Sequence, residues 1–503
     1  MSSGGGDMVD EAGRGRGSAS ERLGMSRLGA LFEIDLRSLA LFRIGVAVTL
    51  LVDLASRVRD MDAFYAAQGV LPPALARSLW DRRVALSPFT WVAESTPLLW
   101  TGVFLLATAA LCLAMGLVPR WAAAAAWFLL AALQDRNPGL YMSGDRYLLL
   151  LLMWCILLPT GARLSVRPAP IGVTRIRSLA GAGLLVQIMI VYVLTGLKKT
   201  GTEWTDGTAL WYALNHQYVT VVGSWLRSQT ALLGILSRAI RWTEVFGPLL
   251  VLSPWCNAAA RTIAVMLFWA FHLGVYTFQG IGVFQLVGLS AWLVFLPSAV
   301  WDRRAAWESS GAHRVEQRCH PPRWSEVLSL VPLSYLVIVM AYASTGLVLR
   351  GSPHYPGPPV IDRLARFLHL HEGWAMFSSV GFYRIWFVAP GQLADGSEVN
   401  VLRRAPLDWA TPSDLQTAQR GFRWSQYLMN VVPRGLDEPP FREIYPPLLG
   451  YLCREWNAHN RGEHRLVRIS MVGMVERIPD VGSLTTGQAQ RVMIATRDCP
   501  DGL

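Results

Sequence analysis

The stretch LAGAGLLVQIMIVYVLTGLKK (residues 179–199) decides the fold of this 503-residue chain. It carries no charged residue until it ends in two adjacent lysines, Lys198 and Lys199. The hydrocarbon core of a bilayer is about 30 Å thick, so a helix needs roughly 20 mostly apolar residues to cross it. The stretch therefore predicts a membrane-spanning helix whose two lysines lie at the membrane surface.

The whole composition agrees with a membrane protein. Hydrophobic residues make up 52% of the chain and charged residues only 16%, against about 25% charged in soluble domains. The mean hydropathy is +0.32. These values exclude a disordered, collagen-like or small disulfide-stapled protein and argue against a soluble enzyme. The net charge of +11 is interpreted as a charge bias that orients spans in a bilayer, not as a nucleic-acid surface.

Other apolar runs of similar length predict an all-α polytopic membrane bundle of about nine spans, with eight as the alternative count. We expect it in the inner (cytoplasmic) membrane, with the lipid bilayer as its partner. The runs lie near residues 39–56, 97–117, 119–134, 145–160, 179–197, 235–253, 259–276, 281–299 and 326–349.

Charge in the connections predicts the orientation. The connections 159–178 and 300–325 are rich in arginine, and such segments remain in the cytoplasm. This places the N-terminus in the cytoplasm, and nine spans then place residues 351–503 outside it. Six scattered cysteines contain no C-x-x-C pair, so we predict neither a zinc site nor a thiol redox motif.

Three regions follow from these patterns. Residues 1–38 are expected to be a disordered cytoplasmic tail, because their Gly/Ser/Arg mixture cannot form a core. Residues 39–350 form the transmembrane bundle. Residues 351–503 are expected to form an extracytoplasmic soluble α+β domain, with a hairpin turn at Asp395-Gly396, a helix near 448–457 and a strand near 465–475.

The lysine pair is the main candidate for chemistry. Lys198 and Lys199 are the only lysines among 46 basic residues. Arginine stays protonated, whereas a desolvated lysine can become a neutral amine and accept a proton. Two ammonium groups about 7 Å apart at an effective dielectric of 20 repel by roughly 2.4 kcal/mol, which favours deprotonation. The alternative is an interfacial anchor in which both side chains reach the headgroups.

Other ionisable residues lie inside the predicted spans, where charges are costly and usually face the bundle interior. Arg43 and Asp53 are about 15 Å apart along one helix and need partners elsewhere. Arg241 and Glu244 are three residues apart and are predicted to pair with each other. His272 is interpreted either as a hydrogen-bonded core residue or as a secondary member of a site.

A polar connection and an aromatic segment also have interpretations that follow from their composition. The polar connection 134–146 is either a cavity wall or a solvated loop. The aromatic segment 374–377 is assigned to the core or an interfacial belt, with no binding role.

Several short strings carry a family resemblance that extends from Leu39 to Pro297. The sequence resembles bacterial proteins with the horizontally transferred transmembrane (HTTM) domain, relatives of the vitamin K-dependent gamma-carboxylase. The strings are Ala40–Gly45, Val52–Leu54, Phe64–Tyr65, Gly69–Pro72, Arg136–Pro138, Gly144–Asp145, Leu158–Arg163, Tyr192, Gly196–Lys199, Trp204, Gly207 and Phe271 to Gly282.

The resemblance implies a nine-span bundle and a specific reaction. The carboxylase has a lysine pair before a similar tryptophan, and its second lysine is the catalytic base, so that role would fall on Lys199, with Lys198 tuning it. Glu244 and His272 would be secondary site members. The base takes a proton from a reduced naphthoquinone (vitamin K hydroquinone-like), oxygen converts the quinone to an epoxide, and a glutamate γ-carbon of a peptide or protein substrate captures CO2. No metal is implied.

Two functions of other classes stay open. One is a non-catalytic membrane anchor whose outer domain binds a partner. The other is a lipid or solute transporter, which requires a polar path through the bundle that includes Arg43, Asp53 and Glu244. The sequence contains no Walker, H-E-x-x-H or G-x-S-x-G motif. It does not indicate the oligomeric state.

Overall fold

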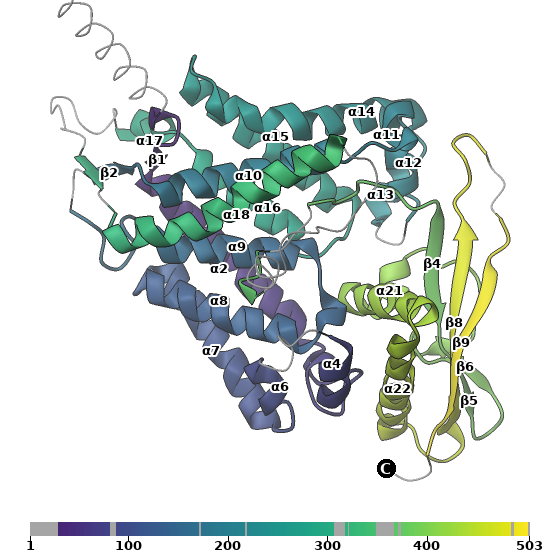
Figure 1. Cartoon of the computed structure of the whole chain (residues 1–503). Coiled ribbons are helices and arrows are strands. Elements are labelled where there is room, and N and C mark those ends of the chain that lie inside the picture. The colour runs from purple at the N-terminus through teal and green to yellow at the C-terminus, as the bar shows by residue number, and fades with distance from the viewer. Residues whose placement is uncertain are drawn as a thin grey trace, which may run out of the picture.

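A computed structural model of the chain is mostly helical, with a sheet near the C-terminus (Figure 1). It describes residues 29–80, 87–170, 173–216, 219–305, 317–319, 321–348, 367–370, 374–483 and 487–500. Most of the predicted tail (residues 1–28) and the predicted linker after residue 350 lie outside the described residues. Within the tail region, β1 (Ile34–Asp35) is described, and the first long helix already begins at Leu36.

A helix covers each predicted apolar run, and these helices pack into one bundle (Figure 1). They are α2 (Leu36–Val58), α7 (Thr96–Met115), α8 (Pro119–Arg136), α9 (Ser143–Leu157), α10 (Leu179–Leu197), α14 (Thr230–Phe246), α15 (Asn257–Phe278), α16 (Phe284–Trp292) and α18 (Arg323–Val348).

The prediction of about nine membrane spans is not supported. Within the described residues, four helices are long and apolar enough to cross a bilayer: α2, α7, α10 and α15. Several of the other runs give shorter or interrupted elements, whereas α18 is 26 residues long. Helix α9 has 15 residues, and α14 and α16 each end in a 3-10 turn, η2 (Gly247–Leu252) and η3 (Leu293–Phe295). The coarser prediction, a helical membrane protein, agrees with the four apolar helices.

The four candidate spans differ in their surroundings. Helix α10 is mostly buried within the protein, whereas α7 and α15 bury only about a third of their residues. Their outward side chains are large and apolar, with Phe104 68% exposed and Met266 62% exposed. Such a surface is unfavourable in water and suits contact with lipid chains.

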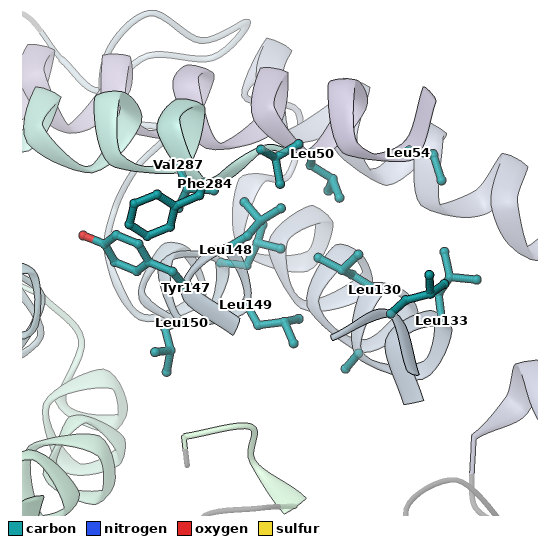
Figure 2. Packing of buried hydrophobic residues seen from close by; sticks show 14 of the residues in the cluster. Leu50, Leu54, Leu130, Leu133, Tyr147, Leu148, Leu149, Leu150, Phe284 and Val287 are labelled. Atoms are coloured by element: carbon teal, nitrogen blue, oxygen red, sulfur yellow. The ribbon is translucent and has the colours of Figure 1, made fainter. Parts of the chain in front are cut away.

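The centre of the bundle is a layer of leucines between α2, α8, α9 and α16. Figure 2 shows Leu148 and Leu149 of α9 between Leu50 of α2 and Leu130 of α8. All four of these side chains are fully buried. These leucine side chains therefore fill the space between the helices, and a cavity has to lie outside this layer.

A small sheet joins distant segments at one end of the bundle (Figure 1). Strand β1 pairs antiparallel with β2 (Val173–Ile176), which pairs in parallel with β3 (Gln317–Cys319). Helix α17 (Ser298–Ala305) lies at this end too. The two arginine-rich connections, which contain β2 and β3, therefore meet beside the start of α2.

The C-terminal region lies at the opposite end and combines a sheet with two helices (Figure 1). The strand order is β4-β8-β5-β6-β7, with β9 also paired to β8, and all pairs are antiparallel. The strands are β4 (Tyr383–Val388), β5 (Pro390–Leu393), β6 (Glu398–Asn400), β7 (Ala405–Pro406), β8 (Leu466–Arg477) and β9 (Gln490–Asp498). The helices are α21 (Phe422–Asp437) and α22 (Tyr445–His459).

The local predictions for this region are confirmed. The Asp395-Gly396 turn joins β5 to β6, with Gly396 at φ +87°, a backbone conformation that favours glycine. The predicted helix lies within α22 and the predicted strand within β8. The sequence did not predict the disulfide between Cys453 of α22 and Cys499, just after β9.

A buried cluster of four charges fixes the C-terminal region to the bundle. Arg57 contacts Asp53 at 2.7 Å and Asp145 of α9 at 2.5 Å. Arg423 of α21 pairs closely with Asp53 and lies 3.7 Å from Asp145. All four residues are buried. Because an unpaired buried charge is costly, each member holds the other three in place.

Other polar residues in the bundle bind backbone oxygens. Arg43 donates hydrogen bonds to the carbonyls of Thr160 at 3.0 Å and Ala114 at 3.2 Å, so its partners come from outside its own helix, as predicted. Arg136, in the polar connection, donates to the carbonyls of Ala66 and Leu71. That residue is fully buried, so this part of the connection is not a solvated loop.

Removing the Arg423 guanidinium tests the four-charge cluster. We expect Arg423→Ala to lower the free energy of unfolding by about 3–5 kcal/mol, because two buried carboxylates would then share one arginine. The matched control is Arg434→Ala on the same helix, whose exposed pair with Glu438 should contribute less than about 1 kcal/mol. The measurement is denaturant unfolding of the detergent-solubilised protein. Equal destabilisation by both variants would contradict a fixing role for the cluster.

Candidate functional site

The two lysines have different environments. Helix α10 ends at Leu197, and Lys198 caps it with its backbone while its side chain is half-buried. Lys199, one residue later, is only 1% exposed. A tryptophan-containing turn, α11 (Thr202–Asp206), follows immediately. The chain therefore turns Lys199 inward, away from the surface position expected of an interfacial anchor.

Lys199 forms an ion pair with Glu244 of α14. Its Nζ lies 2.6 Å from Glu244 Oε2 and donates a hydrogen bond to the Met376 carbonyl at 3.2 Å. It also lies 5.0 Å from the centre of the Trp204 ring, within range of a cation–π interaction. Carboxylate, carbonyl and ring face all stabilise the protonated amine.

Gly196 allows the two helices to approach closely enough for this pair. A β-carbon on Gly196 would lie 2.8 Å from Val245 Cγ2 and 3.0 Å from Glu244 Cβ. Both distances are shorter than ordinary van der Waals contact, so any larger residue would push α14 away from α10. The glycine two residues before the lysine pair thus sets the distance between the amine and its carboxylate.

The ion pair lies in the wall of an apolar cavity. Most of the lining is aliphatic or aromatic, and the two charged groups are Lys199 and Glu244. The lining residues are Tyr192, Thr195, Lys199, Trp204, Leu210, Ala213, Ile240, Glu244, Phe271, Val275, Gln279, Phe284, Met376, Phe377 and Val380. A pocket of this kind, with few polar groups at fixed positions, is typical of a small-molecule site.

The segment 374–380 of the C-terminal region completes this cavity. Besides the Met376 carbonyl on Lys199, the Phe377 carbonyl accepts a hydrogen bond from Trp204 Nε1 at 3.1 Å. The Val380 N–H donates to Glu203 at 3.4 Å. Backbone groups therefore hold the segment against α10 and α11. Met376 and Phe377 line the cavity, a position that the assignment of residues 374–377 to the core or an interfacial belt did not include.

Burial controls the acidity of Lys199, which lies beyond the end of the α10 span. Burial lowers the pKa of the Lys199 ammonium below the ordinary lysine value, and the Glu244 carboxylate opposes part of that change. A lowered pKa increases the fraction of neutral amine at any given pH. Lys199 is thus closer to acting as a base than an exposed lysine is.

His272 is near the cavity but does not line it. The ring is fully buried on α15, and its Nε2 lies 2.6 Å from the hydroxyl of Tyr192, a lining residue. Gly288 of α16 makes room for the ring, because a β-carbon there would lie 2.1 Å from His272 Nε2. His272 therefore contacts the cavity only through lining residues, by the hydrogen bond to Tyr192 and by ring contacts with Phe271 and Phe284.

The predicted pair between Arg241 and Glu244 is wrong. Glu244 pairs with Lys199 instead, and Arg241 lies 5.2 Å from the ring of Trp242 on its own helix. Glu244 points toward α10 and is nearly fully buried. A buried carboxylate is compensated best by a cation that is buried as well, so Glu244 pairs with Lys199 and not with Arg241. Lys198 does not line the cavity.

Sequence reasoning missed the residues that close the site from the C-terminal region. Trp204 and Tyr192 appeared only as parts of the family strings, and nothing in the sequence connected Met376 or Phe377 to Lys199. Within the described residues, no group of three or more His, Cys, Asp or Glu side chains is placed to hold a metal ion. The arrangement places a buried amine, paired with a carboxylate, in the wall of an apolar cavity.

Comparison with known proteins gives one family match. The model of the HTTM domain matches residues 32–301, which include α2 through α16 and both members of the Lys199–Glu244 pair. No curated protein and no solved structure matches the chain. The resemblance to the gamma-carboxylase is therefore not confirmed by these comparisons.

The environment of Lys199 can be measured directly, because the chain has two lysines. Lysine labelled with ¹³C at the ε-carbon should give two NMR signals, assigned with Lys198→Arg and Lys199→Arg. We expect the Lys199 signal to titrate below the ordinary lysine pKa. In Glu244→Gln it should titrate lower still, because the opposing carboxylate charge is gone. A rise of the Lys199 pKa in Glu244→Gln would contradict the ion pair.

Proposed function

The chain belongs to the HTTM domain family, and from that premise we propose that it is a membrane enzyme whose general base is Lys199. The substrate class is a lipophilic molecule with a weakly acidic hydroxyl group. One observation carries the proposal: a buried lysine, paired with Glu244, in the wall of an apolar cavity. A lysine needed only as an anchor would not have to be enclosed in this way.

The lining fits a reduced naphthoquinone. Trp204, Phe271, Phe284 and Phe377 line the cavity and supply aromatic faces for a bicyclic ring. When bound, the reduced quinone would supply the acidic hydroxyl and, with oxygen, the strong base that carboxylation needs.

The residues of the chain would handle the proton. The neutral Lys199 amine accepts it at Nζ, and the ammonium that forms is stabilised by the Glu244 carboxylate, the Met376 carbonyl and the Trp204 ring face. The segment 374–380 covers this region and excludes water, which strengthens each of these interactions. Because burial lowers the pKa of Lys199, less free energy is needed to keep this amine neutral than to keep an exposed lysine neutral.

Tyr192 and His272 would position the ring of the substrate. Tyr192 faces the cavity, and its hydroxyl is held by His272 Nε2 at 2.6 Å. Tyr192 also packs against Phe268 with ring centres 4.5 Å apart, so its orientation is fixed from two sides. Neither residue contacts Lys199 in the described hydrogen bonds and ion pairs, and we assign both to positioning.

We further propose that the C-terminal region lies outside the cytoplasm of a bacterial inner membrane. It lies at the opposite end of the bundle from the arginine-rich connections (Figure 1), and basic connections favour the cytoplasm. The Cys453–Cys499 disulfide also favours this side, because disulfides persist in oxidising compartments.

The two other function classes predict different results. A transporter needs a polar path, but Arg43, Asp53 and Glu244 each have separate internal partners, which favours the enzyme. A non-catalytic anchor would keep its cellular function when both lysines are replaced by arginine, because arginine preserves charge at the membrane surface.

Replacing Lys199 tests the base. In membranes given reduced naphthoquinone and oxygen, we expect Lys199→Ala and Lys199→Arg each to lose about 100- to 10,000-fold in quinone turnover, the usual contribution of a general base. Lys198→Arg should lose far less, because it keeps the positive charge that a tuning role requires. Turnover in wild type should rise with pH and level off above the pKa of Lys199. If Lys199→Arg turned over the quinone at the wild-type rate, the assignment of Lys199 as the general base would be wrong.

The orientation can be tested with a membrane-impermeant maleimide on spheroplasts. We expect a cysteine introduced as Ser397→Cys, in the exposed β5–β6 turn, to be labelled in intact spheroplasts. The exposed Cys256, just before α15 at the other end of the bundle, should be labelled only after permeabilisation. Cys256→Ser provides the background. The reverse labelling pattern would place the C-terminal region in the cytoplasm.

A further inference from the structure

A second cleft lies beside the first, between the bundle and the C-terminal sheet. Unlike the apolar cavity, it is lined largely by polar groups. Its lining residues are Asn215, His216, Val219, Arg227, Arg384, Thr411, Pro412, Ser413 and Leu415. Arg227 follows the short helix α13 (Val221–Leu226), and Arg384 belongs to β4. The cleft therefore exists only where the two regions meet.

Two arginines converge on one side-chain oxygen in this cleft. Arg227 Nη1 donates to Asn215 Oδ1 at 3.2 Å, and Arg384 Nη2 reaches the same oxygen at 3.4 Å. Arg384 Nε also donates to the Asn215 backbone carbonyl at 2.8 Å. The buried Asn215 thus holds two guanidinium groups near each other, although their like charges repel.

The acidic residues of the cleft do not balance this charge. Arg384 pairs with Glu476 at 3.3 Å, and the Thr411 hydroxyl donates to the same carboxylate at 3.3 Å. Among the described residues, no carboxylate pairs with Arg227, which binds only the Asn215 amide oxygen and the Ser224 carbonyl. Burial lowers the pKa of Arg227, and the neighbouring Arg384 charge lowers it further. One positive charge therefore remains uncompensated.

The cleft also lies close to lipid-facing residues and to the apolar cavity. Val222 and Trp225 of α13 are exposed, Trp225 by 65%, and apolar and tryptophan side chains of this kind are typical of the membrane interface. Ala213 and Val380, which line the apolar cavity, lie only a few residues from Asn215 and Arg384. The cleft thus lies where the headgroups of the outer leaflet would be in the proposed orientation.

We propose that this cleft binds a phosphate group between Arg227 and Arg384, carried either by an anionic lipid headgroup or by free inorganic phosphate. Two guanidinium groups can bind phosphate oxygens through paired, charge-assisted hydrogen bonds. The hydroxyl of Ser413 is a further donor at the rim. This inference does not depend on catalysis by Lys199.

The test uses the full-length protein in two arms. In the first, detergent-solubilised protein is titrated with inorganic phosphate by calorimetry. In the second, protein in phosphatidylcholine nanodiscs with or without phosphatidylglycerol is examined for retained lipid by native mass spectrometry. We expect Arg227→Gln to weaken phosphate or phosphatidylglycerol binding at least tenfold, about 1.4 kcal/mol. Arg227→Lys, which keeps the charge but not the fork, should be intermediate.

The matched control is Arg238→Gln, because Arg238 lies at the same end of the bundle and binds only backbone carbonyls of the chain. It should bind like wild type. Binding in the first arm alone identifies free phosphate as the ligand, and binding in the second alone identifies the lipid headgroup. The proposal is overturned if neither probe binds, or if Arg227→Gln and Arg227→Lys both bind like wild type while remaining folded by circular dichroism.

Discussion

Two buried arginines and two buried aspartates carry the arrangement of the whole molecule. Asp53 and Arg57 of α2 meet Asp145 of α9 and Arg423 of α21 in a region closed to solvent. A charge without its partner there costs several kcal/mol, so the cluster tolerates little movement of any element that contributes to it. The C-terminal region is thereby held at one end of the bundle, and both cavities depend on that position.

Each cavity takes its wall from both the bundle and the C-terminal region. Lys199 and Glu244 come from the bundle, whereas Met376 and Phe377 close the apolar cavity from the other side. In the second cleft, Arg227 comes from the bundle and Arg384 from the C-terminal region. One junction thus offers an apolar chamber with a buried amine and a neighbouring basic cleft, a combination suited to molecules with a lipophilic body or an anionic head.

The lysine pair shows how far reasoning from residues could reach. Its isolation in an arginine-rich chain, together with the family strings, singled out Lys199, and the structure encloses that residue beside Glu244. The partner of Glu244 was predicted wrongly, because spacing along one helix favoured Arg241, whereas the contact is made between helices that approach at Gly196. The prediction of nine spans is not supported in the described part of the chain, since apolar runs such as those containing α9 and α16 give helices too short to meet the length criterion.

The sequence by itself determined what local patterns encode: apolar helices, a hairpin turn at Gly396, the elements of the C-terminal sheet and a membership in the HTTM domain family. These depend on residues close together in the chain, whose periodicity and conformational preferences are readable one segment at a time. Only the tertiary structure decided that Met376 covers Lys199, that Arg423 binds Asp53 and that Cys453 bonds to Cys499. Such contacts join segments far apart in the chain, and they form because burial makes each charge or polar group take the partner that packing places beside it, wherever that partner lies in the sequence.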